Sequence, residues 1–154
     1  MKDPSERPVG VARAGDPVSR VSQLREEWRM ARTAHADLVC MGMPRVNILL
    51  LGSDGVIQNL LETLGPDLRH PICVWSPRER FALPTDHVKS LVLRDVGTLK
   101  HADQMRLLQW LDRNTGGTQV VSTSNVPLMP RVRSGAFLET LYYRLNTIVL
   151  DVTV

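Results

Sequence analysis

The chain has 154 residues, of which 43% are hydrophobic, and a formal charge of +3, which together fit one globular domain with a single core. Its longest apolar runs hold only about six residues, far fewer than the ~20 that a membrane helix requires, and the N-terminus has no apolar signal segment. We therefore expect a soluble, cytoplasmic protein. The charge excess is small and the arginines are scattered, so basicity alone gives little support for nucleic-acid binding.

Cysteine and histidine are not arranged for metal binding. Cys40 and Cys73 lie in apolar stretches without the spacing of a zinc knuckle or a disulfide framework, so we expect buried free thiols. The histidines are His35, His70, His87 and His101. Their spacing does not suit a metal site, and we predict no metal.

The N-terminal region divides into an arm and the start of a domain. Residues 1–17 hold three prolines, two glycines and mixed charges without apolar periodicity, which predicts a flexible arm. We place one domain over residues 18–154. From Val18 to about Met41, apolar residues recur at three- and four-residue steps, which predicts an amphipathic helix. These residues are Val21, Leu24, Trp28, Ala31, Ala34 and Leu38.

Five short β-rich runs follow, and most are continuously apolar, as expected of strands that are covered on both faces in a parallel sheet. The runs are Val46–Leu51, Pro71–Trp75, Ser90–Arg94, Gln119–Ser124 and Thr147–Val152. Helical patterns separate most of them, at Gly55–Leu64, His101–Asn114 and Phe137–Leu145. Residues 76–89 have the character of a loop that joins two strands. This alternation predicts a layered α/β domain.

The most specific motif lies near the C-terminus, where residues 135–146 read GAFLETLYYRLN. This segment is similar, nearly letter for letter, to Gly-x-Phe-Arg-x-Asp-Leu-Tyr-Tyr-Arg-Leu-Asn in the ATPase domain of sigma-54-dependent transcription activators, a branch of the AAA+ superfamily. The runs LVLRDVGTLKHADQMRLLQWL and QVVSTSN resemble the segments that precede it in that family. The resemblance is strong after Leu91 and weaker back to Val18. It implies a three-layer α/β/α core of the P-loop NTPase type, with a five-stranded parallel sheet.

The resemblance places the family's phosphate-binding loop on residues 52–59, GSDGVIQN. The corresponding positions are Gly52, Ser53, Asp54, Gly55, Ile57 and Gln58. A phosphate loop works because consecutive backbone N–H groups and a helix N-terminus converge on the phosphates, and its lysine reaches the β- and γ-phosphates. Ile57 stands at the last glycine of the loop and Gln58 at the lysine. We expect a loop whose frame persists but whose working residues are lost.

The second catalytic element has changed as well. Under the same resemblance, Arg94 stands at the aspartate that holds magnesium, and Asp95 at the glutamate that activates the attacking water. A cation at the metal position repels magnesium, and phosphoryl transfer depends on electrostatic stabilisation and positioning. Arg94 could instead replace the metal ion as a positive charge that binds phosphate, but we favour this interpretation less. Asp95 has a simpler alternative role, capping the turn before Gly97.

Further departures from the family concern its partner contacts. The loop over residues 76–89 lacks the Gly-Ala-Phe-Thr-Gly-Ala segment with which the family contacts the sigma factor. Leu138 stands at the first arginine of the Phe-Arg…Tyr-Tyr-Arg segment, although Arg144 keeps the second. The resemblance ends at Val154 without a helical lid or a helix-turn-helix segment, so we expect no direct DNA binding.

Two residues keep both a functional and a structural interpretation. Asn125 matches the family's sensor residue, which orients a water beside the γ-phosphate, but a turn-forming asparagine is favoured. Arg144 matches an arginine finger that acts in a neighbouring subunit's site, but a surface or intrachain ion pair is favoured.

These substitutions favour a catalytically inactive AAA+-like module that regulates or binds a protein partner, with no catalytic residue of its own. The partners that the resemblance suggests are an authentic AAA+ ATPase of the same family, a second copy of this chain, or a signalling protein. The alternative is a nucleotide-binding switch without hydrolysis, in which residual ATP or ADP binding persists. An active ATPase in transcription regulation is the least favoured reading. We expect no cofactor under the leading hypothesis.

Overall fold

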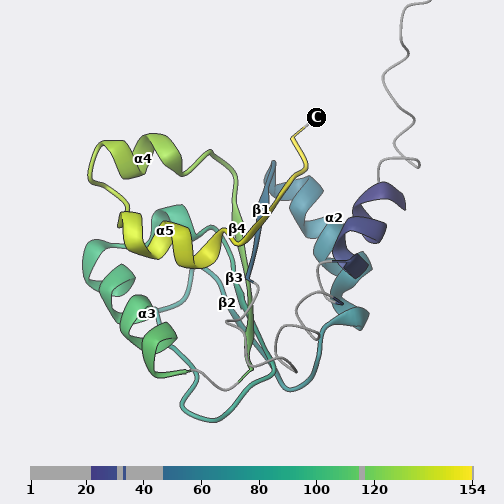
Figure 1. The fold of residues 1–154 in the computed structure, drawn as a ribbon, viewed down its shortest axis with the longest axis horizontal. Helices are drawn as coiled ribbons and strands as arrows, with labels where there is room; N and C mark the ends of the chain where they lie inside the picture. Colours follow the sequence, from purple (N-terminus) through teal and green to yellow (C-terminus); the bar gives the residue numbers. More distant parts are fainter. Residues whose placement is uncertain (1–21, 31–32, 34–46, 115–116, 154) are drawn as a thin grey trace, which may run out of the picture.

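The computed structural model describes residues 22–30, 33, 47–114 and 117–153, and Figure 1 shows them as helices packed on both faces of one sheet. The strands are β1 (Ile48–Leu51), β2 (Ile72–Trp75), β3 (Ser90–Leu93), β4 (Gln119–Ser124) and β5 (Ile148–Asp151). All neighbours are parallel, in the order β2-β3-β4-β1-β5. The predicted α/β fold with a five-stranded parallel sheet is confirmed.

Burial explains why these runs form the sheet. Every residue of β3 and of β4 is buried, as apolar strands in the middle of a doubly covered sheet must be. β2 and β5 are the edges, and each leaves a valine exposed, Val74 at 53% and Val149 at 42%. The observed strands lie within the predicted runs and are at most two residues shorter at either end.

The helices are α2 (Asp54–Leu64), α3 (His101–Arg113), α4 (Met129–Arg133) and α5 (Glu139–Leu145), with short 3₁₀ turns at Gly65–Asp67 and Val96–Thr98. The three helices predicted between the strands are confirmed. α4 was not predicted, because five residues with a proline at the start give almost no periodic signal. Residues 22–30 are helical, as predicted, while the arm at 1–17 and most of the remaining Val18–Met41 segment lie outside the described residues.

Two clusters of buried side chains fill the spaces on the two faces of the sheet. On one face, Leu107 and Leu111 of α3 and Leu141 and Leu145 of α5 pack against the strands. On the other face, α2 packs beside the helical residues 22–30, and Trp28 is fully buried there. In Figure 1, α3 and α5 stand on one side of the strands and α2 on the other. The expected three-layer arrangement follows from these two cores.

A buried glutamine joins α3 to the start of α5. Gln104 is fully buried, and its amide nitrogen donates hydrogen bonds to the carbonyl oxygens of Leu99 (2.9 Å) and Ala136 (3.0 Å). Its amide oxygen accepts a hydrogen bond from the backbone N–H of Leu138 at 2.8 Å. Leu138, which replaces the family's first arginine, also packs against the core. This side chain therefore fixes how the GAFLETLYYRLN segment sits on α3.

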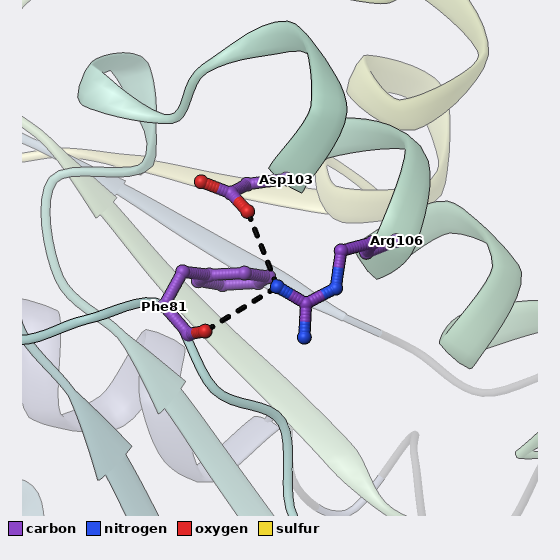
Figure 2. A network of polar contacts seen from close by, with 3 residues as sticks. All are labelled: Phe81, Asp103 and Arg106. Carbon is purple, nitrogen blue, oxygen red and sulfur yellow. Dashed lines mark hydrogen bonds and ion pairs between the residues drawn. The ribbon is translucent and has the colours of Figure 1, made fainter.

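The segment 76–89 is a loop, as predicted, and it is anchored to α3. Phe81 is buried and meets Trp75 edge to face, with ring centroids 5.2 Å apart. Figure 2 shows Arg106 of α3 between the Asp103 carboxylate and the Phe81 carbonyl oxygen, with nitrogen–oxygen distances of 3.3 and 3.5 Å. The guanidinium carbon also lies 5.6 Å from the centroid of the Phe81 ring. The loop is held at its middle, which fixes the position of its first residues.

The cysteine prediction is corrected in part. Cys73 is a free thiol, but it is only half-buried, because β2 is an edge strand. Cys40 lies outside the described residues.

Candidate functional site

The candidate site lies at the carboxyl ends of the strands. Parallel strands end at the same edge of a sheet, and ligands of open α/β folds bind outside that edge. β1 is followed there by α2, β2 by the loop 76–89, and β3 by the turn at Asp95. The predicted phosphate-loop and metal positions therefore meet at one edge.

The turn between β1 and α2 is much shorter than a phosphate loop. β1 ends at Leu51 and α2 begins at Asp54, so only Gly52 and Ser53 stand between strand and helix. The backbone N–H of Ile57 already donates to the carbonyl oxygen of Ser53 at 2.9 Å, as in an ordinary helical turn. Residues 54–57 of the expected loop therefore form the first turn of α2, and of the expected frame the N-terminal N–H groups of this helix remain.

The two matching glycines have different structural roles. A Cβ at Gly52 would lie 2.4 Å from Cγ2 of Val152, just after β5, and the Gly52 N–H donates to the carbonyl oxygen of Ser124. A Cβ at Gly55 would meet nothing within 4 Å. Gly52 is thus explained by the packing of neighbouring chain segments, and Gly55 has no steric requirement.

The two substituted loop positions also have structural explanations. Ile57 is 2% exposed and belongs to the core that α2 forms with the sheet. The Gln58 amide nitrogen donates to the Glu62 carboxylate one helical turn later, at 2.6 Å. Where a lysine would reach phosphate, the chain has a buried apolar residue followed by a side chain that pairs along its own helix.

Asp95 occupies a special backbone position. Its φ of 48° lies in the left-handed region, the one such case among non-glycine residues in the described part of the chain. Its N–H donates to the Thr123 hydroxyl at 2.9 Å, and its carbonyl oxygen accepts from the Thr98 hydroxyl. The carboxylate makes no capping hydrogen bond, so the expected cap comes from the main chain of Asp95.

Two carboxylates at this edge act against the binding of an anion. Burial raises the pKa of the Asp95 carboxyl above its ordinary value, and the nearby negative charge of Asp54 raises it further. Arg131 of α4 acts in the opposite direction, while its guanidinium donates to the carbonyl oxygen of Gly97. Two carboxylates thus face the region where a phosphate would lie.

A pocket of about 590 Å³ opens at this edge. Its lining consists of Asp54, Ile57, Ser76, Pro77, Arg78, Glu79, Arg94, Asp95 and Thr123. It unites four of the sequence-predicted positions, from α2 and from the end of β3. Gly52, Ser53, Gly55, Gln58 and Asn125 do not line it.

Asn125 and Arg144 are placed elsewhere. Asn125 is exposed, and the hydrogen bonds of its turn come from the Ser124 hydroxyl, which donates to the carbonyl oxygen of Val126 at 2.6 Å. Arg144 forms an ion pair with Asp112 of α3, and its carbonyl oxygen accepts from the Asn47 amide. These contacts agree with a turn position for Asn125 and an intrachain ion pair for Arg144.

Thr123, Arg78 and Glu79 were missed by the sequence reasoning. Thr123 is 3% exposed and lies one residue before the end of β4, so a polar residue at the carboxyl end of a buried strand was the available signal. Arg78 and Glu79 follow β2 by a few residues and line the pocket from the loop at its carboxyl end.

The described residues contain no candidate metal site and no candidate membrane-spanning helix. Across residues 22–30, 33, 47–114 and 117–153, no group of three or more histidine, cysteine or acidic side chains is placed to hold a metal ion. In the same part of the chain, no helix has the length and apolar character needed to span a membrane.

Comparison with known proteins agrees with this architecture. Residues 80–154 match the family model described as the sigma-54 interaction domain. Crystal structures of NtrX from Brucella abortus are similar in fold. One in complex with ADP has a TM-score of 0.53 at 18% identity over 70% of this chain, and one in complex with ATP has 0.55 at 18% over 81%. A third has 0.54 at 17% over 88%. No curated protein sequence matches.

The sheet order and the layered helices define an α/β domain with a five-stranded parallel sheet, a fold that is similar to that of the NtrX structures. Residues 80–154 are similar to the sigma-54 interaction domain family, whose model they match. This confirms the resemblance carried by GAFLETLYYRLN. The chain spans only 32%, 35% and 40% of the three NtrX chains, and at this level of identity the likeness establishes the fold alone.

Proposed function

We propose that this chain is a catalytically inactive AAA+-like regulatory module, related to sigma-54-dependent transcription regulators, that acts in the cytoplasm by associating with a protein partner. The observation that carries the proposal is the start of α2 at Asp54, with only two residues between it and the end of β1. A turn of that length leaves only the first N–H groups of α2 and no loop that could surround a polyphosphate.

The charges at the site support the same conclusion. Phosphoryl transfer relies on cations that neutralise the phosphates and on a metal held by carboxylates. Here the lysine position carries Gln58, which pairs with Glu62. The metal position carries Arg94, and Asp54 and Asp95 add negative charge to the same pocket. The lysine and the metal-holding aspartate that the family's reaction uses are therefore both replaced at their positions.

The partner is proposed from the relationship to a family of assembling ATPases. An authentic AAA+ ATPase, a second copy of this chain or a signalling protein are the candidates. Arg144 could complete a neighbouring subunit's site only after leaving Asp112. An Arg144→Ala variant that leaves the partner's turnover unchanged would exclude the finger role.

A nucleotide-binding switch without hydrolysis is the second candidate. It is favoured by the pocket itself, which lies at the N-terminus of α2 and contains Arg78 and Arg94. The similar NtrX protein has been crystallised with ADP and with ATP. In this chain, such binding would have to proceed without a lysine and against two carboxylates.

Thermal unfolding of the full chain with millimolar Mg·ATP, Mg·ADP or no nucleotide separates the candidates. We expect equal melting temperatures. A ligand at about 100 times its Kd stabilises by roughly 2.7 kcal/mol, a shift of several degrees for a chain of this size. Such a shift would favour the switch. Phosphate release above the blank, lost in Asp95→Asn, would contradict both readings and indicate an active ATPase.

A further inference from the structure

The pocket at the carboxyl edge carries charges of both signs at different places. Arg78 follows β2 and Arg94 follows β3, while Asp54 begins α2 directly after β1. β3 and β4 separate β2 from β1 in the sheet. The basic residues therefore gather toward the β2 end of the pocket, where Glu79 is the one acidic residue of the lining, and Asp54 lies toward the β1 end, with Asp95 between them.

These charges are not used within the fold. In the part of the chain that the structure describes, neither Arg78 nor Arg94 forms an ion pair, and neither do Asp54 and Asp95. Arg131 influences Asp95 from outside the pocket lining, but its guanidinium is engaged with the carbonyl oxygen of Gly97. Arg94 and Asp95 are half-buried, whereas Arg78 and Asp54 are exposed. Half-buried charges without ion-pair partners lose hydration and gain little in return, so a ligand that supplies opposite charges to Arg94 and Asp95 is favoured.

The remaining lining limits the size and character of that ligand. Ile57, Pro77, Ser76 and Thr123 are uncharged, and Ile57 and Thr123 are held in place by burial. A volume of about 590 Å³ lies within the range of about 300–1,000 Å³ typical of small-molecule sites. The rim is also fixed, because Phe81 anchors the loop that carries Arg78 to α3 (Figure 2).

The charge pattern disfavours ligands of a single sign. A polyphosphate would meet the carboxylates of Asp54 and Asp95, with Glu79 at the same pocket. A simple cation would meet two arginines. A ligand with separated positive and negative groups satisfies both ends, because a guanidinium pairs with a carboxylate in a planar fork and carboxylates accept from an ammonium group.

We propose that this pocket binds a small zwitterionic ligand of the free amino-acid class, with its carboxylate toward Arg78 and Arg94 and its ammonium group toward Asp54 and Asp95. The inference rests on the proposed function, since it requires that the site no longer receives nucleotide. It adds a ligand-sensing role to the partner-binding module.

The test is thermal unfolding of the full chain against the twenty L-amino acids, each at millimolar concentration, followed by calorimetric titration of any that stabilise. We expect at least one to raise the melting temperature. Its N-acetyl derivative and its carboxamide, each of which removes one charge, should both lose the effect. Arg94→Gln and Asp54→Asn should each weaken binding at least about tenfold, as expected for a lost charge-assisted hydrogen bond. Arg113→Gln, at an exposed position of α3, should bind as the wild type does.

Inorganic pyrophosphate, Mg·ATP and ethylammonium serve as single-sign probes in the same assay. No stabilisation by any amino acid would overturn the inference and leave the proposed function intact. Equal stabilisation by an amino acid and its charge-blocked derivatives would overturn it as well. Stabilisation by ethylammonium alone would indicate a cation site, and stabilisation by Mg·ATP would overturn both the inference and the proposed function.

Discussion

The β1–α2 turn and the GAFLETLYYRLN segment differ in how their polar groups are satisfied. Around the second segment, Gln104 and Asn47 provide hydrogen-bond partners for main-chain groups of the α4–α5 connection and of Arg144. At the pocket beside the first, Arg78, Arg94, Asp54 and Asp95 have no ion-pair partner in the described ranges. The C-terminal segment is therefore held by hydrogen bonds to the buried Gln104 side chain, whereas the charged side chains beside the β1–α2 turn have no ion-pair partner among the described residues.

Removing the Gln104 amide should cause the largest loss of stability, because three hydrogen bonds of this buried side chain are lost with it. Gln104→Leu keeps a similar volume but leaves two carbonyl oxygens and one N–H without partners. An unsatisfied buried group costs about 1–3 kcal/mol, so we expect a loss of about 3 kcal/mol in the free energy of unfolding. Urea denaturation measures it. Gln109→Leu, at an exposed position of the same helix, should change stability by less than about 0.5 kcal/mol. Equal effects of the two substitutions would refute the bridging role.

Alanine substitutions at Gly52, in the β1–α2 turn, and at Gly55, in the first turn of α2, should change the free energy of unfolding in opposite directions. Gly52→Ala should destabilise by about 1–3 kcal/mol, the usual cost of overpacking, because the new Cβ would contact Val152 at 2.4 Å. Gly55→Ala should stabilise by up to about 1 kcal/mol through helix propensity. Chemical denaturation of both variants checks the signs. The cost at Gly52 should shrink in a Val152→Ala background; an unchanged cost would mean that the clash is not its cause.

Asp95→Asn should stabilise the protein at neutral pH and raise its melting temperature. The change in the free energy of unfolding should be smaller in size than the losses expected for Gln104→Leu and Gly52→Ala. Burial and Asp54 raise the pKa of Asp95 above its ordinary value of 3.8. Its stabilising contribution is thus complete below about that value and is lost as the pH rises through the raised folded pKa. Asparagine also tolerates the left-handed backbone. The advantage of the variant should appear at pH 7 and vanish below pH 3.8. Unfolding curves across this range that show no change in advantage would contradict the assignment.

The Arg144–Asp112 pair should contribute least. Their side chains are 41% and 58% exposed, and exposed ion pairs are worth about 0–1 kcal/mol. A double-mutant cycle with Arg144→Ala and Asp112→Ala should give a coupling below about 1 kcal/mol that falls with added salt. A larger, salt-independent coupling would show that the pair is an essential part of the C-terminal segment.

Much of the fold could be predicted because continuous apolar strands and periodic helices report burial directly. The boundaries of Gln119–Ser124 and the beginning of α3 at His101 needed no knowledge of the tertiary structure. α4 could not be predicted, since its position depends on the turn at Ser124 and on contacts that no local pattern encodes. The start of α2 was predicted within one residue, yet the sequence alone suggested a phosphate-loop frame that so early a helix does not leave.

The candidate site was predictable only in part. Asp54, Ile57, Arg94 and Asp95 were located by alignment to the family motifs, and all four line the pocket. Thr123 and Arg78 were not, because their participation depends on the register of β4 and on the path of an anchored loop. Gln58 was placed at the lysine position of the phosphate loop, and its side chain donates to Glu62 along its own helix, which the residue type alone does not determine.

Calorimetric titration of Mg·ATP into the full chain tests the central claim most directly. If α2 leaves no phosphate loop, the heats should equal those of dilution at every nucleotide concentration up to the millimolar range. Saturable binding that is weakened by Arg94→Gln but unaffected by Arg113→Gln would contradict the account, because it would show that the pocket still receives a nucleotide.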